Sequence, residues 1–432
     1  MIFAARRKNH RWDLEALETA TRAALHQAGA KLLEQLLEAP LEAEPEQPCH
    51  CGRRARHRGR RPKKMLTLLG EVEIERPYYL CGACPQGQFP FDRELDVADT
   101  QYSPGVRRMM ALVGSESSFE GGREQLRVLA GLEVTTKAVE RGAEAIGTDL
   151  AAREQEQIQR AVQLPLPQVT GADIPILYIE MDGTGVPVVA AETIGRPGKD
   201  GAERARTREV KLGCVFTQSR LDTDGRPLRD EASTSYTAAI EAAEQFGRRI
   251  WQQAWQRGWS RAKKKVVIGD GAVWIWNLSH QYFADAVEIV DLYHARQHLW
   301  ELAAQLWPDD KRGRRLWAKK RQRQLDRGKI EQLVVALRDF AAPQKDLARR
   351  LATEADYFER NAARMRYPSF RKQGFFIGSG VIEAGCKTVI AQRLKQSGMF
   401  WTVRGANAIV ALRCARLSGR FEDYWENRAQ AA

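Results

Sequence analysis

Two stretches of sequence decide the fold: YIEMDGTGVPV at residues 178–188 and KKKVVIGDGAVW at residues 263–274. Each contains an apolar run typical of a buried strand and then reaches Asp-Gly, which is typical of the turn after a strand. We expect five strands, at residues 176–182, 186–192, 210–217, 266–268 and 287–290, and helices at 236–258 and 274–283. This order predicts an α/β domain with a mixed five-stranded sheet flanked by helices.

Two carboxylates fall where these strands are expected to end. Asp182 closes the first apolar run, and Asp270 lies between two glycines after the fourth. Because functional groups of open α/β sheets gather at the carboxyl edge of the strands, we expect both acids at one rim. Two acids there repel each other unless a cation offsets their charge. Hard carboxylate oxygens favour Mg²⁺ or Mn²⁺, so the pair predicts a divalent metal site.

A third acid, Glu383, lies in the sequence FFIGSGVIEAGCK, residues 375–387. The Gly-Ser-Gly at 378–380 predicts a loop that opens the last helix, which places Glu383 in the first turn. Taken alone, an acid there is ordinarily a surface group favoured by the helix dipole. Together, two strand-end Asp residues and a late helical Glu suit phosphoryl transfer by two metal ions about 4 Å apart.

Four motifs, in their order along the chain, resemble one known group of enzymes. They are YIEMDGTGVP (178–187), VVIGDGAVWIWN (266–277), VDLYHARQHLWE (290–301) and IGSGVIEAGCK (377–387). They are similar to the ISKra-type family of bacterial insertion-sequence transposases, and more distantly to Mutator-like elements. The likeness covers about residues 176–420 and, more loosely, the cysteine segment before them. It implies an RNase H-like fold with a DDE triad of Asp182, Asp270 and Glu383.

The resemblance implies roles for further residues. The triad would hold two Mg²⁺ ions, and about residues 300–375 would form an all-helical insertion. Asp291 and His294 match a D-x-x-H motif in which His294 would contact the scissile phosphate or a flipped base. A structural histidine paired with an acid is the alternative. Arg393 and Lys395 would meet DNA phosphates, or would lie on an ordinary solvated face.

The implied activity is cleavage and strand transfer of double-stranded DNA, at the terminal inverted repeats of a mobile element and in its target. A homo-oligomer on DNA is expected. Two other classes remain open: a catalytically silent, domesticated DNA-binding protein, and an RNase H-like nuclease or resolvase. The presence of all three acids argues against the first. Separate N-terminal recognition modules argue against the second.

Four of the seven cysteines form a metal-binding pattern. A Cys-x-Cys pair precedes a predicted β-hairpin at residues 65–79, and a Cys-x₂-Cys pair follows it. The hairpin would bring the pairs together, and four thiolates in two pairs are typical of one structural zinc ion. The first pair is tighter than usual, so His50 or His57 could replace one cysteine, and free buried thiols are the alternative. The expected zinc ligands are Cys49, Cys51, Cys81 and Cys84.

Basic residues are concentrated in two segments. Residues 53–64 (RRARHRGRRPKK) hold eight Lys or Arg and no acid, and residues 311–327 form the second concentration. Attached to a zinc-ribbon-like module, the first segment predicts a reader of the phosphate backbone at element ends. The residues expected to contact DNA there are Arg53, Arg54, Arg58 and Arg60.

The rest of the N-terminal sequence is helical in pattern. Spaced leucines predict one helix over residues 10–39, stopped by Pro40 and suited to packing or dimerisation. Three helices are predicted over residues 103–160, and two of them, joined by a short glycine-bearing turn, resemble a helix-turn-helix. Lys137 and Arg141 would then contact DNA. Plain three-helix packing is the alternative.

The composition and net charge limit the classes of protein and partner that the sequence allows. The 432 residues carry 68 Lys+Arg and 55 Asp+Glu, a net charge of +13, which favours a polyanionic partner, nucleic acid before membrane. No run approaches the length of a membrane span and the N-terminus lacks a signal-peptide core, so a cytoplasmic, nucleoid-associated protein is expected. An odd number of cysteines argues against a disulfide framework. The expected segments are an N-terminal helix and acidic linker (1–47), a zinc-ribbon-like module (48–95), a helical module (96–162) and the catalytic domain (163–432).

Overall fold

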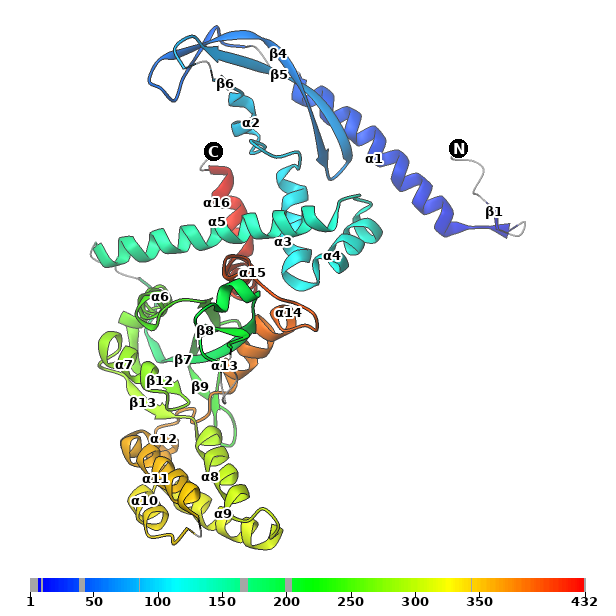
Figure 1. Cartoon of the computed structure of the whole chain (residues 1–432). Coiled ribbons are helices and arrows are strands. Elements are labelled where there is room, and N and C mark those ends of the chain that lie inside the picture. The colour runs from blue at the N-terminus through cyan, green and yellow to red at the C-terminus, as the bar shows by residue number, and fades with distance from the viewer. Residues whose placement is uncertain are drawn as a thin grey trace. The chain divides into compact units, whose positions relative to one another are not determined.

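The computed structural model describes residues 7–8, 11–38, 43–84, 86–163, 170–198, 204–342 and 344–430. Two compact units make up the chain: Met1–Ile146 with Glu422–Ala432, and Gly147–Phe421 (Figure 1). The predicted helix stop at Pro40 and the middle of the predicted linker at 163–175 lie outside the described residues. None of the described helices combines the length and the apolar character that a bilayer-spanning helix needs.

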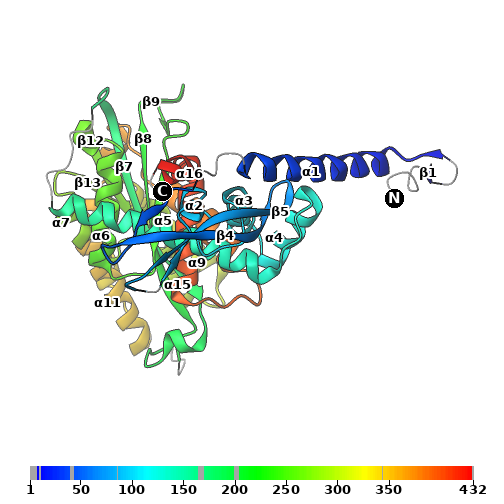
Figure 2. The ribbon, with the colours of Figure 1, turned by 90° about the horizontal axis from the view of Figure 1, so that it is seen from above.

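The second unit is built on a mixed five-stranded sheet, as the sequence predicted. Its strands are β7 (Ile174–Pro187), β8 (Thr207–Gln218), β11 (Ser235–Ala239), β12 (Ala262–Gly269) and β13 (Val287–Val290). They lie in the order β11-β8-β7-β12-β13. β8 is antiparallel to β7 and β11, whereas β7, β12 and β13 are parallel. Figure 2 shows β8, β7, β12 and β13 side by side. Two short strands, β9 (Arg220–Leu221) and β10 (Pro227–Leu228), pair between β8 and β11.

Two predicted elements of this sheet are wrong. Residues 186–192 do not form a separate strand, because β7 continues to Pro187 and a 3₁₀ turn, η2 (Ala190–Thr193), follows. The predicted helix at 236–258 begins instead as strand β11, and the helix α6 covers only Ala243–Gln256. The fifth strand of the sheet is therefore β11, which pairs along β8 from Ser235 to Ala239.

Helices cover both faces of the sheet. On one face, Phe246 and Ile250 of α6 approach Gly213 so closely that a side chain there would meet them at 3.2 and 2.6 Å. α7 (Val273–Tyr282) packs beside α6. On the other face, Leu212 lies against Gly385 in a helical run. That run and the helix after it are α13 (Gly380–Gly385), the π-helical η5 (Cys386–Ala391), α14 (Gln392–Leu394) and α15 (Val403–Leu417).

The expected helical insertion lies between β13 and α13, and forms a lobe beyond β13 (Figure 1). Its helices are α8 (Leu292–Leu306), α9 (Lys311–Asp326), α10 (Ile330–Arg338), α11 (Lys345–Arg360), η4 (Ala362–Met365) and α12 (Tyr367–Lys372). α8 packs on α9 and α11, and α10 packs on α11. A short 3₁₀ turn, η3 (Trp259–Arg261), precedes β12.

The first unit contains a four-stranded antiparallel sheet ordered β3-β4-β5-β6. Its strands are β3 (Glu46–Pro48), β4 (Arg54–Thr67), β5 (Gly70–Cys81) and β6 (Gly87–Gln88). The predicted hairpin is present but longer, since β4 includes most of the basic segment. Ala30 of α1 (Leu14–Glu38) is buried with Val72 and Ile74 of β5. The short strands β1 (Arg7–Lys8) and β2 (Arg11–Trp12) pair before α1.

The three predicted helical pieces are also present, and the last of them continues beyond Ile146 into the second unit. They are α3 (Pro104–Glu116), α4 (Phe119–Gln125) with its π-helical extension η1 (Leu126–Ala130), and α5 (Thr136–Gln163). Ser103 caps α3 by accepting from the Val106 backbone N–H at 3.3 Å, and Gly131 ends η1 with a φ of 68°. The first unit also holds α2 (Pro90–Glu94) and most of the last helix, α16 (Phe421–Gln430).

Candidate active site and metal centre

The first two acids lie level with each other on neighbouring parallel strands. Glu180 of β7 pairs with Ile268 of β12, so Asp182 and Asp270 each stand two residues beyond a matched pair. Asp270 directly follows β12, as predicted. Asp182 does not end its strand, because β7 remains paired to β8 at that point, where Asp182 faces Leu212. Both acids therefore lie at the carboxyl edge of the parallel strands.

The surroundings of Asp182 resist a negative charge. Burial raises the pKa of this carboxyl, and the neighbouring charge of Asp270 raises it further. A hydrogen bond from the Cys386 thiol to Oδ2 at 3.3 Å and one from the Gly183 backbone N–H to Oδ1 at 2.6 Å act in the opposite direction. The positive potential of His294 also lowers the pKa of Asp182. A cation at this rim would relieve the repulsion between the two acids.

Alternate residues of β7 anchor the segment that carries Glu383. Tyr178 accepts the Phe376 backbone N–H at 3.2 Å, and the buried Glu180 accepts that of Ile382 at 2.8 Å. The third residue on this side of the strand is Asp182, which accepts from Cys386 in the turn after Glu383. Since side chains two apart on a strand share one face, a single face of β7 aligns the loop, the helix start and Asp182.

Glu383 itself lies where the sequence placed it, in the first turn of α13, and its side chain is exposed. The helix changes to π-helical geometry at Cys386. Such π-bulges occur frequently at functional sites. The negative charge of Glu383 also contributes to the raised pKa of Glu180.

Glu180 is a functional-site residue that the sequence reasoning missed. Its side chain has no exposed surface, and burial raises its pKa to about 8, with Asp291 and Glu383 adding to the effect. One oxygen, Oε1, has no hydrogen-bond partner among the described residues. A signal was present in the sequence, because an acid inside an otherwise apolar strand is rarely buried without a reason.

Asp291 and His294 are not partners of each other. Asp291 caps α8 by accepting the Tyr293 backbone N–H at 2.7 Å, and its other oxygen accepts from the Ser379 hydroxyl at 2.6 Å. It thereby ties the start of α8 to the loop before Glu383. His294 contacts a second histidine instead, with its Nε2 at 3.1 Å from Nε2 of His298.

The two expected phosphate contacts on the last helical run differ in accessibility. Arg393 has no exposed surface and lies over the Trp401 ring, with 4.9 Å from its guanidinium carbon to the ring centroid. It therefore does not fit the DNA-contacting role expected of it. Lys395 is exposed, and its Nζ donates to the Thr184 hydroxyl at 2.5 Å, two residues beyond Asp182 on β7.

The donors at the rim suit a hard divalent cation but are not drawn together as a ligand set. Within the described residues, the ligand atoms of Asp182, Asp270 and Glu383 do not form a group close enough to hold an ion. Oxygen donors of this kind are the ones that Mg²⁺ and Mn²⁺ prefer. Asp182, Asp270 and Glu383 therefore suit a divalent cation by the chemistry of their oxygen atoms and by their location at the rim.

Four cysteines do form a compact ligand group in the first unit. Their sulfurs all lie within 4.8 Å of one another, with Cys49 and Cys84 at 3.5 Å and Cys51 and Cys81 at 3.6 Å. Sulfurs around a tetrahedral zinc ion, bound at about 2.3 Å, are about 3.8 Å apart, so the geometry fits. The backbone N–H groups of Ala83 and Cys84 lower the pKa of Cys81 to about 6, which favours the thiolate that a metal needs.

The sheet explains why these cysteines meet. One pair lies in the turn between β3 and β4, and the other comprises Cys81 at the end of β5 and Cys84 in the turn that follows. Gly52, with a φ of 81°, allows the tight first turn. His50 is exposed, and its Nδ1 is 3.6 Å from the Cys49 sulfur, while the four ligand atoms of the group are all cysteine sulfurs.

The predicted DNA contacts of the first unit are all on its surface. Arg53, just before β4, and Arg54, Arg58 and Arg60 on this strand are exposed. The strand carries a β-bulge between His57 and Arg60, which bends it. Some nearby cations are paired: Lys63 contacts Asp92 at 3.2 Å, and Arg54 contacts Glu46 at 3.7 Å.

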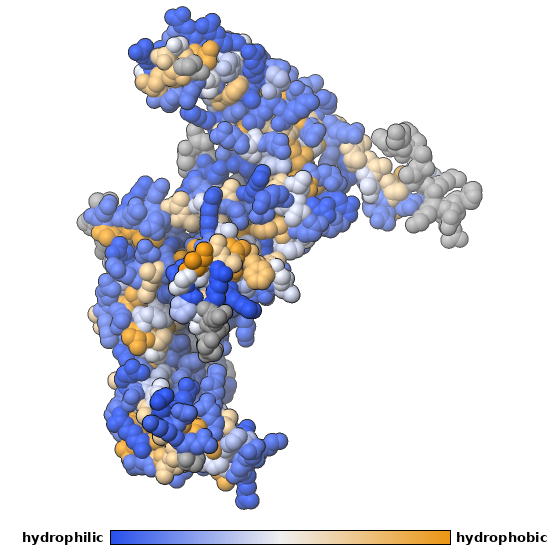
Figure 3. Space-filling view, viewed as in Figure 1, coloured by the Kyte–Doolittle hydropathy of each residue, from blue (hydrophilic) through white to orange (hydrophobic). Residues whose placement is uncertain are grey.

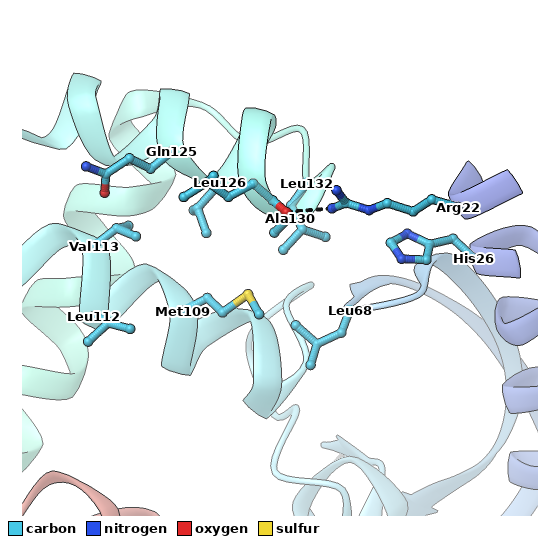
Figure 4. A pocket seen from close by; sticks show the side chains of 11 residues that line it. Arg22, His26, Leu68, Met109, Leu112, Val113, Gln125, Leu126, Ala130 and Leu132 are labelled. Atoms are coloured by element: carbon cyan, nitrogen blue, oxygen red, sulfur yellow. Dashed lines mark hydrogen bonds between the residues drawn. The ribbon is translucent and has the colours of Figure 1, made fainter. Parts of the chain in front are cut away.

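In the helical module, Lys137 and Arg141 are both exposed. Lys137 also forms an ion pair with Glu140 at 2.7 Å. A pocket of about 380 Å³ lies between α1 and this module, and it contains none of the predicted site residues (Figure 4). Its wall is mostly apolar, and Arg22 crosses it to donate to the Leu129 carbonyl at 2.7 Å.

Comparisons with known proteins give a family likeness. Residues 7–196 match a family described as "Uncharacterised protein family (UPF0236)". A UPF0236 protein encoded in the vanSb 3′ region of Streptococcus gallolyticus is 23% identical over 384 residues, which cover 84% of this chain and 75% of that protein. The solved Drosophila P element transposase strand transfer complex matches 74% of this chain and 80% of its own, with 9% identity and a TM-score of 0.24. The segment matched by the family contains the four clustered cysteines and Asp182, and ends before Asp270 and Glu383. The chain is thus similar to UPF0236 proteins over the cysteine sheet, the helical module and the first strand of the mixed sheet.

Proposed function

We propose that this protein is a DNA transposase of an insertion sequence, which cleaves element ends and joins them to target DNA. The observation that supports the proposal is that Asp182 and Asp270 lie at one sheet edge and that β7 also contacts the helix of Glu383. Asp182 and Asp270 stand level on parallel strands, and the face of β7 that bears Asp182 also anchors the helix of Glu383.

In this proposal Asp182, Asp270 and Glu383 hold two divalent cations, Mg²⁺ or Mn²⁺. When bound, such ions activate the attacking oxygen and stabilise the leaving oxygen of a phosphodiester. The chain's own contribution is positioning. The exposed Lys395, held beside Thr184, is placed to meet a phosphate that enters the rim. His294 would contact the same phosphate or a displaced base.

The first unit would supply recognition of the element ends. The four cysteines would hold one structural zinc ion, which fixes the turns at one end of the β4–β5 hairpin. The exposed arginines of β4 would then follow the phosphate backbone, while Lys137 and Arg141 would contact DNA from the helical module. Phosphate contacts position a protein on DNA, and base contacts specify the sequence.

The exposed face of α1 is the proposed assembly surface. Leu14, Leu25, Leu32 and Leu36 are 57–69% exposed, although the opposite side of the helix packs on β5. On the face shown in Figure 3, hydrophobic residues along α1 lie among hydrophilic ones. Leucines of this spacing suit the pairing of helices from two copies of the chain.

Cleavage of labelled element-end DNA in Mg²⁺ tests the proposal. We expect Asp182→Asn, Asp270→Asn and Glu383→Gln to abolish cleavage while end binding persists. Asp285→Asn is the matched control, because this acid is an exposed partner of Lys265 on the surface of the same unit. Normal cleavage by any of the three variants would remove that residue from the site. Specific end binding by wild type without cleavage would favour a catalytically silent DNA-binding protein.

A further inference from the structure

A second histidine lies behind His294 and is held by a buried acid of the helical insertion. His298, one helical turn further along α8, has its Nδ1 at 2.7 Å from a carboxylate oxygen of Glu354 on α11. The Glu354 side chain is only 2% exposed, and its other oxygen forms an ion pair with the guanidinium of Arg350 at 2.9 Å. Glu354 is 56 residues away in sequence, so the insertion fold creates this contact.

The same helix also touches the turn that carries Asp270. The Tyr357 ring stacks on the His298 ring, with 4.3 Å between centroids and 7° between planes. The Tyr357 hydroxyl donates to the Asp270 backbone carbonyl at 2.9 Å. A side chain at Gly271 would come within 2.5 Å of the Tyr357 ring, so glycine is needed there. Tyr357 of α11 therefore connects His298 of α8 to the turn that carries Asp270.

Hydrogen-bonding chemistry then determines which ring nitrogens carry protons. A carboxylate can only accept, so Nδ1 of His298 carries a proton toward Glu354. In neutral His298 the free lone pair is on Nε2, which faces Nε2 of His294 at 3.1 Å. His294 must therefore be the donor in that contact, which leaves its Nδ1 as an unprotonated acceptor.

We propose that Glu354 and His298 are positioning residues that hold His294 in the Nε2–H form with Nδ1 free to accept a proton. The insertion is then part of the reaction centre and not only a DNA-facing lobe. The catalytic meaning of this arrangement rests on the proposed function. The hydrogen-bond chain itself does not, because it consists of contacts within the protein.

The first test reads the proton positions directly. Full-length protein with ¹⁵N-labelled histidine is studied by long-range NMR correlation, with the His294 and His298 signals assigned from Gln variants. We expect wild type to show one fixed form at each ring, Nδ1–H at His298 and Nε2–H at His294. Glu354→Ala should release His294 into a mixture of forms. Glu354→Gln, which keeps an accepting oxygen, should largely restore the fixed form.

A matched control is available on the same helix. Glu359→Ala removes another glutamate of α11 that pairs with an arginine, Arg338, but on the exposed surface, and it should leave the His294 signals unchanged. If Glu354→Ala does not fold, His298→Gln serves instead, since it leaves Glu354 paired with Arg350. That variant should also release His294.

The second test measures single-turnover cleavage of element-end DNA. Glu354→Ala should slow cleavage roughly 10- to 100-fold, as loss of an outer partner of a working side chain ordinarily does, with DNA affinity unchanged. Glu359→Ala should cleave like wild type. Three results would each overturn the inference. They are mixed forms of His294 in wild type, identical His294 signals in wild type and Glu354→Ala, and equal cleavage rates for the two Ala variants. If wild type cleaves no DNA, the proposed function fails, and the NMR result alone decides the hydrogen-bond chain.

Discussion

α9 carries a line of cations at four-residue spacing, which winds by about 40° per step around the helix: Lys311, Arg315, Lys319, Arg323 and, at the helix end, Arg327. All five are exposed, and none has an ion pair within the described residues. Some cations on other exposed helices are paired, as in Lys31 with Glu34 and Arg248 with Glu244. Residues four apart lie on one helix face, so this line is a surface suited to a DNA backbone.

The perturbation is the triple variant Arg315→Gln, Lys319→Gln, Arg323→Gln. Each phosphate contact contributes about 0.9 to the slope of log affinity against log salt, so three contacts contribute about 2.7. Between about 50 and about 200 mM salt, the wild-type affinity for duplex DNA should then fall about 40-fold more than that of the variant. Arg314 is left unchanged because it does not face outward: its guanidinium donates to the Trp307 carbonyl at 3.0 and 3.1 Å.

The assay is a salt titration of binding to random-sequence duplex, measured by fluorescence anisotropy. The control variant, Lys31→Gln, Arg248→Gln, Arg338→Gln, removes the same charge from paired surface positions. We expect its slope to stay near that of wild type. An unchanged slope in the α9 variant, or an equal drop in the control, would refute the reasoning, because the line of cations would then act only through net charge.

Three other predictions follow from the site and the first unit. The pKa of Glu180 is raised to about 8 in the folded chain, so its contribution to stability is present below the unfolded pKa and is lost as pH rises through about 8. Glu180→Gln should therefore melt increasingly higher than wild type between about pH 5 and pH 9, by an amount equivalent to a few kcal/mol; parallel melting curves against pH would contradict this. Metal analysis should find one zinc per chain, lost together with the fold of the β3–β6 sheet in a Cys81→Ser/Cys84→Ser variant, and retained zinc in that variant would exclude these ligands. Leu25→Glu/Leu32→Glu should lower the mass measured by light scattering without changing the helical content, unless assembly uses another surface.

Local sequence pattern predicted the features that neighbouring residues control. The apolar run before Asp270 and the glycines around it correctly predicted a strand at 266–268, which the structure extends to Ala262–Gly269. The Gly-Ser-Gly loop correctly placed Glu383 in the first turn of a helix. The cysteine pairs could be related because the hairpin between them has its own alternating pattern. In each case the decisive interactions lie within a few residues.

Features that depend on distant partners could not be predicted in the same way. β7 extends past Asp182 because β8 pairs along its whole length, and an apolar run does not reveal how far its partner reaches. Arg393 looked like a surface cation, but Trp401 folds back against it. The contact between His298 and Glu354 joins two helices of the insertion and leaves no signal in either segment alone.

The backbone N–H of Leu292 donates to the Ile377 carbonyl at 2.9 Å, so the two ends of the insertion meet at its base. A segment whose ends meet can change in length or content with little disturbance to the body from which it emerges. The insertion can therefore vary far from this base, whereas Asp291 at the start of α8 and Tyr357 of α11 are bound to β12 and to the turn of Asp270. If the proposed function is right, an engineered chimaera with a different α9 and α10 should change its DNA affinity while its three acids stay in place.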